Sequence, residues 1–350
     1  MRLINTKTLK LEEFFDHAIP KYAILSHTWD KDEVLLTDVT GSLWDAKDKA
    51  GFTKIENCCR QAVRDGWEYA WVDTCCIDKR SSAELSESIN SMFRYYKEAQ
   101  VCYAYLSDVP PEDFTNCDTT AVDDSVERSA RTTESSAFSR SRWFTRGWTL
   151  QELLAPDRVV FYNSNWESFG TKSTLRDEIS SITSIDDQTL NGRSFDQCSV
   201  ARRMSWAARR KTTRVEDTAY CLMGIFDVNM PLLYGEGNKA FERLQREIMM
   251  KSTDRSLLAW RLEADDVNAY HAVLARSPAA FATCHSLRPC RPLKYDDAIM
   301  EMTNLGLRIS LPLWPWYRSK TSNRNIPDPK KRRISPGLGP LESCFISKPS

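Results

Sequence analysis

The amino-acid sequence predicts an α/β protein whose core is a mainly parallel sheet with flanking helices. Short apolar runs, each followed by a polar loop, alternate along the chain with segments of helical periodicity. Strands joined by crossover helices produce this pattern. The runs are too short for helices and end in turn-forming residues, as buried parallel strands do. The expected strands are residues 22–26 (YAILS), 69–73 (YAWVD), 101–106 (VCYAYL) and 159–162 (VVFY).

The segments between these runs predict the helices. Between 51 and 65, apolar side chains recur at helical spacing, and Gly66 ends the pattern. From about 84 to 99 a second apolar face repeats every three or four residues, with Ser82 as its expected N-cap. A shorter helix is expected over 147–154, directly before the last strand.

The composition along the chain predicts the domain organisation. The sheet domain is expected over 1–165, with a flexible surface insertion at about 110–140 that is rich in Asp, Ser, Thr, Glu and Arg. Helical periodicity dominates 166–260, which we expect to be a helical extension. Residues 261–317 are mixed and are expected to be rich in β-structure. The polar tail 318–350, rich in Pro and Ser, is expected to be disordered.

Charge and cysteine content narrow the class of protein. The 350 residues are 41% hydrophobic and 27% charged, typical of a globular domain, and 48 basic residues balance 48 acidic ones. No global charge therefore favours nucleic acid or anionic lipid, and no apolar run is long enough for a membrane span. The eleven cysteines contain no C-x-x-C and accompany four histidines, so we expect buried free thiols, no metal site and a cytoplasmic protein.

Polar residues at the ends of the expected strands predict a pocket. Ligands of an open parallel sheet bind at the carboxyl ends of its strands, near the point where the strand order reverses. Polar clusters follow two expected strands at 26–30 and 73–78, and a third lies at 142–152. The expected binding residues are Ser26, His27, Trp29, Asp73, Asp78 and Trp148, and the expected catalytic residue is Glu152.

These side chains suit a planar ligand attached to a sugar, although each has a structural alternative. Trp29 and Trp148 can stack on a planar ring, with Glu152 facing the sugar. Alternatively, the tryptophans belong to the core and Glu152 is a solvated charge at a helix N-terminus. Ser26 and His27 equally suit a strand-terminating turn, and the two aspartates suit turn caps. The sequence contains no P-loop, no Rossmann G-x-G-x-x-G and no G-x-S-x-G elbow.

Four ordered motifs resemble the fungal heterokaryon incompatibility (HET) domain. The stretch 202–248 is similar to the segment that follows this domain in many members, so the resemblance covers roughly residues 1–260. Asp30 departs from the family pattern, which usually has Gly at that position. The four motifs are YAILSHTWD (22–30), WVDTCCIDK (71–79), ELSESINSMFRYYKEAQVCYAYLSDV (84–109) and SRWFTRGWTLQELLAP (141–156).

The resemblance implies a flavodoxin-like fold and an activity, because the HET domain looks like a distant relative of the TIR domain. Trp148, Leu150, Glu152 and Leu153 match the W-x-L-x-E-L run of many TIR domains. In those relatives the Glu of this run is the catalytic residue that cleaves nicotinamide from NAD. Carried over, the resemblance implies that Glu152 is the catalytic residue and that NAD is a substrate, with no other cofactor.

The expected function is that of a cytoplasmic cell-death effector of heterokaryon incompatibility that acts as an NAD nucleosidase. The expected partners are NAD or a related nucleotide, further copies of the chain and an upstream activating protein. Two alternatives remain open: a non-enzymatic, self-associating interaction module, and an inactive structural fragment or decoy. Fold alone does not decide between them.

Overall fold

The computed structural model describes residues 1–350 except 16–17, 40, 112–135, 262–272, 290–299 and 310–350. The chain divides into two compact units, one made of residues 1–193 and 209–240 and the other of residues 194–208 and 241–350. The expected disordered tail, 318–350, lies outside the described residues, as does most of the expected insertion.

The first unit is built on a seven-stranded mixed sheet of order β2-β1-β4-β3-β5-β6-β7. The four central strands β4, β3, β5 and β6 are parallel, and β1, β2 and β7 pair antiparallel at the two edges. The strands are β1 (Arg2–Asn5), β2 (Leu11–Glu13), β3 (Tyr22–His27), β4 (Tyr69–Trp71), β5 (Val101–Tyr105), β6 (Val159–Tyr162) and β7 (Ser168–Thr171).

The four strands expected from the sequence are these four parallel neighbours, so the α/β architecture is confirmed. The edge strands β1, β2 and β7 were not predicted, because they are three or four residues long and lack the apolar runs of buried strands. Strand β3 lies between β4 and β5, so the chain first adds a strand on one side of β3 and then crosses to the other. The strand order therefore reverses beside β3, where a ligand site is expected.

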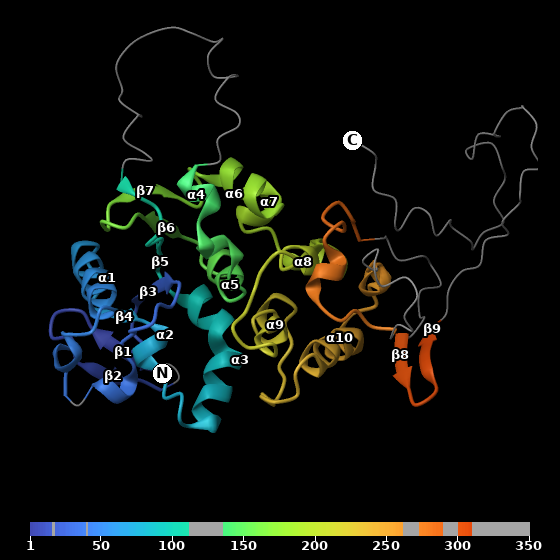
Figure 1. The fold of residues 1–350 in the computed structure, drawn as a ribbon, viewed down its shortest axis with the longest axis horizontal. Helices are drawn as coiled ribbons and strands as arrows, with labels where there is room; N and C mark the ends of the chain where they lie inside the picture. Colours follow the sequence, from blue (N-terminus) through green and yellow to red (C-terminus); the bar gives the residue numbers. More distant parts are fainter. Residues whose placement is uncertain (16–17, 40, 112–135, 262–272, 290–299, 310–350) are drawn as a thin grey trace, which may run out of the picture. The chain divides into compact units, whose positions relative to one another are not determined.

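Helices cover both faces of this sheet. Figure 1 shows α1 on one side of the sheet and α3 with α5 on the other. Short 3-10 turns η2 (Leu36–Asp38), η3 (Leu43–Ala46), η6 (Arg142–Thr145) and η8 (Met223–Ile225) link these elements. The helices of this unit are α1 (Phe52–Arg64), α2 (Asp73–Cys76), α3 (Ser82–Glu98), α4 (Ala137–Arg140), α5 (Thr149–Leu154), α6 (Arg176–Thr183), α7 (Asp187–Leu190) and α9 (Asp217–Tyr220).

The helix termini follow the local chemistry of the sequence. Helix α1 ends before Gly66, which has a φ of +84° and so adopts the left-handed conformation that glycine tolerates best. The N-cap of α3 is Ser81 instead of the expected Ser82, because the Ser81 hydroxyl accepts a hydrogen bond from the Glu84 N–H. Helix α4 occupies the end of the expected insertion, where Phe138 is buried against Phe144 and Phe161.

The core of this unit is apolar and contains buried thiols. All residues of β3 and β6 are buried. Burial raises the pKa of the Cys58 and Cys102 thiols well above the ordinary value, which keeps them protonated and unreactive. The expectation of buried free thiols is confirmed for the cysteines that the structure describes: Cys58, Cys59, Cys75, Cys76, Cys102, Cys198, Cys221 and Cys284.

The second unit is mainly helical in its described part. Helix α8 packs against the 3-10 turns η9 and η11, and its N-terminal amide at Val200 donates a hydrogen bond to Asp254. Within the expected β-rich stretch, β8 and β9 form an antiparallel hairpin. The elements of this unit are η7 (Phe195–Gln197), α8 (Val200–Ser205), most of α10 (Lys239–Lys251), η9 (Arg255–Leu258), η11 (Pro278–Phe281), β8 (Met300–Thr303) and β9 (Gly306–Ile309).

Across the described ranges of both units, every helix is too short or too polar to cross a membrane.

Candidate functional site

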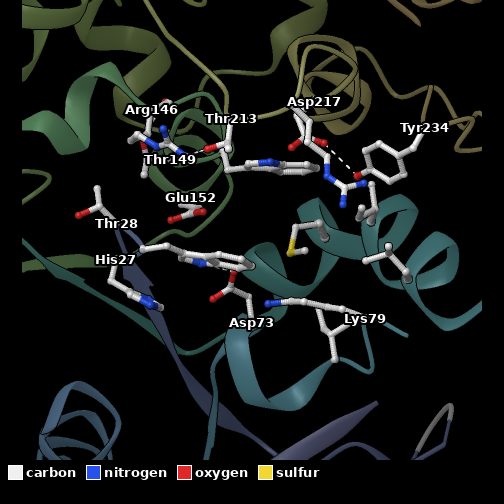
Figure 2. A pocket seen from close by; sticks show the side chains of 17 residues that line it. His27, Thr28, Asp73, Lys79, Arg146, Thr149, Glu152, Thr213, Asp217 and Tyr234 are labelled. Atoms are coloured by element: carbon white, nitrogen blue, oxygen red, sulfur yellow. Dashed lines mark hydrogen bonds between the residues drawn. The ribbon is translucent and has the colours of Figure 1, made fainter. Parts of the chain in front are cut away.

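A pocket with a cavity of about 280 Å³ lies at the carboxyl edge of the parallel strands. The pocket is lined by residues at the end of β3 and just after it (27–29) and by residues after β4 (73–79). Others come from α3, from the start of α5 and from 213–234. Figure 2 shows Glu152 between His27 and Asp73 on one side and Arg146 and Thr213 on the other. The lining residues are His27, Thr28, Trp29, Asp73, Ile77, Lys79, Leu85, Ile89, Met92, Arg146, Trp148, Thr149, Glu152, Thr213, Arg214, Asp217 and Tyr234.

Glu152 is a buried carboxyl group held by two residues in series. The Ser26 hydroxyl donates a hydrogen bond to Glu152 Oε2 at 2.5 Å, and Trp143 Nε1 donates to the Ser26 oxygen at 2.8 Å. Because Trp143 has no lone pair to offer, it fixes Ser26 as the donor toward Glu152. Ser26 itself is fully buried beneath the carboxyl group and does not line the cavity.

Burial and a neighbouring carboxylate favour the neutral form of Glu152. Burial raises its pKa to about 8, the hydrogen bond from Ser26 lowers it, and the negative charge of Asp73 raises it further. Only 7% of the residue is exposed. The alternative of a solvated charge at a helix N-terminus is therefore wrong, although Glu152 does lie in the first turn of α5.

Trp29 and Asp73 form one side of the pocket. Trp29 Nε1 donates a hydrogen bond to Asp73 Oδ2 at 2.9 Å, and the Lys79 ammonium lies 3.6 Å from the centre of the Trp29 ring. Burial lowers the pKa of Lys79. The Trp29 side chain is 47% exposed, so it belongs to the pocket rim and not to the core.

Trp148 forms another part of the wall together with Asp217 and Tyr234. The Tyr234 hydroxyl donates to Asp217 Oδ1 at 2.9 Å. Burial raises the pKa of Asp217, while hydrogen bonds from Tyr234 and Trp148 oppose this shift. Both aromatic residues expected at the site, Trp29 and Trp148, therefore line the cavity.

The loop after β3 is held by a partly buried network of charged residues. His27 Nε2 lies 3.5 Å from Glu33 Oε2, and Lys54 Nζ donates to Glu33 Oε1 at 2.5 Å and to Asp30 Oδ2 at 2.7 Å. Burial alone would raise the pKa of Glu33, but His27 and Lys54 hold it down at about 2. Arg142 also contacts Asp30, at 2.5 Å, so the aspartate that departs from the family's Gly is an ion-pair residue here.

One expected binding residue lies elsewhere. Asp78 pairs with Arg80 at 3.1 Å, and its backbone N–H donates to Glu84, so it closes the turn before α3 and does not line the cavity. The turn-cap alternative describes Asp78 correctly. His27, Trp29, Asp73, Trp148 and Glu152 are brought together as expected.

Sequence reasoning missed the residues contributed by α3 and by 213–234. Leu85, Ile89 and Met92 were expected on a core-facing helix stripe, and they line the cavity because this stripe also forms its apolar wall. Arg214 and Tyr234 lie about 60 and 80 residues beyond Glu152 along the chain, and no motif spacing links them to the sheet edge. Within the described residues, no cluster of three His, Cys, Asp or Glu is arranged to hold a metal ion.

Residues 22–152 match the family described as heterokaryon incompatibility protein (HET). The vegetative incompatibility protein HET-E-1 of Podospora anserina is 46% identical over 233 residues, which are 66% of this chain and 16% of that relative. The chain thus corresponds to about a sixth of the relative's length. No solved structure matches the chain. The family match covers β3, β4, β5, α3 and Glu152, and residues 22–152 of this chain therefore form a HET domain of the heterokaryon incompatibility family.

Proposed function

We propose that this chain is a cytoplasmic cell-death effector of heterokaryon incompatibility whose pocket cleaves the bond between nicotinamide and ribose in NAD. The relative's name, a vegetative incompatibility protein, supports the biological role. The resemblance of residues 148–153 to the TIR run supports the reaction. The observation that carries the proposal is the position of Glu152, a buried carboxyl group at the carboxyl edge of the sheet. Its pKa is raised to about 8, close to neutral pH.

The chemistry requires one carboxylate. Nicotinamide in NAD is a pyridinium, so when the bond between its nitrogen and ribose C1′ breaks, the electron pair returns to the nitrogen and a neutral molecule leaves. Positive charge develops on C1′ and the ring oxygen, and an ionised Glu152 stabilises it electrostatically. Water then adds to C1′ and releases a proton to solvent, which yields ADP-ribose. A general acid for the leaving group is unnecessary.

The substrate itself promotes ionisation of Glu152. A cation within about 4–6 Å lowers the pKa of a carboxyl group, and the pyridinium of NAD is such a cation. The pocket surrounds this ring with the carboxyl groups of Asp73, Glu152 and Asp217 and with apolar side chains of α3. The cavity of about 280 Å³ is at the small end for ligand sites, so we place the nicotinamide riboside end of NAD inside it.

The decisive experiment measures NAD consumption by the purified, concentrated chain and by Glu152→Gln. The loss of an electrostatic stabiliser predicts a fall of roughly 10²–10³-fold in turnover. Glu178→Gln is the matched control, because Glu178 is an exposed acid in the first turn of α6, outside the pocket, and its loss should leave turnover unchanged. Equal NAD turnover by the parent and a folded Glu152→Gln variant would contradict the proposal.

Biological activity separates the enzyme from the non-enzymatic alternative. In the proposal, self-association and an upstream activator bring the pocket into its active state, and Glu152→Gln abolishes cell killing on overexpression. If the folded variant still kills cells while the parent consumes no NAD, the chain signals as a self-associating interaction module.

A further inference from the structure

Residues 209–237 form part of the pocket although they lie outside the stretch 22–152 that matches the HET family. Thr213, Arg214, Asp217 and Tyr234 line the cavity, and this segment belongs to the same compact unit as the sheet. The pocket of the domain is therefore incomplete without a segment that follows it in the chain.

This segment clamps the turn that leads into α5. Gly147 N donates to the Lys211 carbonyl at 3.0 Å, and Lys211 N donates to the Thr145 carbonyl at 2.7 Å. A Cβ at position 147 would lie only 2.4 Å from Cγ2 of Thr212, so a larger residue there would have to displace the Thr212 side chain. The Arg146 guanidinium adds a hydrogen bond to the Thr213 hydroxyl at 2.9 Å.

Arg210 adds two side-chain hydrogen bonds to this clamp. Its Nη1 donates to the Arg146 carbonyl at 2.8 Å and to the Thr149 hydroxyl at 2.9 Å. Thr149 is the first residue of α5, and Glu152 follows within the same turn. Nη2 of Arg210 is shielded from solvent. Burial lowers the pKa of Arg210 to about 10, so the guanidinium stays charged at neutral pH.

We propose that Arg210 is a positioning residue for Glu152. Its two hydrogen bonds fix the first turn of α5, and its permanent positive charge favours the ionised carboxylate that the pocket requires. Through Arg210, the segment 209–217 helps to position Glu152 and to determine its charge. The inference rests on the proposed function only where activity is the readout, because the effect on the charge of Glu152 does not depend on any substrate.

The groups around Glu152 determine what a change at Arg210 does. Asp73 on α2 raises the pKa of Glu152, and Arg210 and Arg146 lower it. Ser26 on β3 lowers it through its hydrogen bond, and His27 contributes to the same cavity. Three neutral groups also lie in the electrostatic range of Glu152: Tyr96, Cys102 and Cys221. When the Arg210 charge is lost, only the Ser26 hydrogen bond and Arg146 oppose burial and Asp73, so the pKa of Glu152 rises.

A double-variant cycle in the full chain tests this proposal. The free energy of unfolding is measured as a function of pH for four proteins: the parent, Glu152→Gln, Arg210→Met and the double variant. In each background, the chain with Glu152 is compared with the chain that carries Gln at this position. The difference between the two curves stops changing at the pKa of Glu152. We expect this pH to rise by about one unit or more in the Arg210→Met background. Arg209→Met is the matched control, because Arg209 is exposed. This variant should leave the pH at which the difference stops changing as it is in the parent.

Two further variants separate the effect of the Arg210 charge from an effect on folding. Arg210→Gln retains an amide donor without the charge, so it replaces Arg210→Met if the methionine variant does not fold, and the same upward shift is expected. Arg210→Lys retains the charge and should stay near the parent value. A folded charge-free variant with the parent's titration would overturn the proposal. An upward shift in a chain that consumes no NAD supports the role of Arg210 and rejects the proposed reaction.

Discussion

At Glu152, burial in the fold favours the neutral carboxyl group, whereas the proposed reaction uses the ionised carboxylate. A carboxyl group with an ordinary pKa near 4.5 is ionised in the unfolded chain at neutral pH, whereas the folded chain raises its pKa to about 8. Folding therefore requires that this group takes up a proton or remains charged in a buried site. A side chain that costs stability at neutral pH is a candidate for function.

This conflict predicts how stability depends on pH. The folded pKa lies above the unfolded one, so the contribution of Glu152 is fully present below about pH 4.5 and is lost as the pH rises to about 8. Glu152→Gln removes this loss, because the amide does not titrate. The free energy of unfolding of the variant minus that of the parent should therefore increase by on the order of 3–5 kcal/mol as the pH is raised from 5 to 8.

Urea unfolding at a series of pH values measures this gain. Glu178→Gln, at an exposed helix start, should follow the parent at every pH. A difference between Glu152→Gln and the parent that stays constant from pH 5 to pH 8 would show that the carboxyl group is ionised throughout.

At the scale of elements, the pocket depends on how closely α3 approaches the segment that follows the domain. Helix α3 supplies the apolar wall, and η8 packs directly against it. Gly224 in η8 lies against Phe93 of α3, where an added Cβ would be 2.1 Å from the Phe93 Cβ. This contact holds residues 213–234 against the sheet domain and so keeps their side chains at the cavity.

Gly224→Ala is therefore expected to destabilise the chain. The new methyl group has no space and must displace α3 or η8, an overpacking that typically costs about 1–3 kcal/mol. Thermal unfolding measures the loss, and Gly41→Ala is the control, since nothing lies within 4 Å of the Cβ that it would add. Equal melting temperatures for the two variants would show that the contact between η8 and α3 is loose.

At the scale of the whole molecule, the pattern of apolar residues in the sequence was sufficient to predict the four central strands of the sheet. The runs 22–26, 69–73, 101–106 and 159–162 became β3, β4, β5 and β6, because residues buried on both faces must be continuously apolar. The carboxyl ends of parallel strands meet at one edge, so loops distant in sequence were expected to share a pocket. Trp29, Asp73 and Glu152 do share it.

The rest of the site depends on contacts that leave no local pattern. Asp78 follows β4 as Asp73 does, but Arg80, two residues further on, holds it in a turn, and hydrophobic periodicity does not reveal an ion pair of this kind. Asp217 and Tyr234 reach the cavity through packing of the later segment on α3 and on the turn before α5. Their sequence neighbourhood indicates only helix and turn.

If an ionised Glu152 promotes the cleavage of NAD, the pH dependence of kcat/KM for NAD must follow the titration of this carboxyl group. In the free chain the pKa of Glu152 is raised to about 8 by burial, and only the deprotonated form stabilises the developing cation. We expect kcat/KM to rise tenfold per pH unit below this pKa and to level off above it, and we expect Glu152→Gln to show low activity without this rise. A parent profile that is flat from pH 6 to pH 9, or that is unchanged in Glu152→Gln, would contradict the claim.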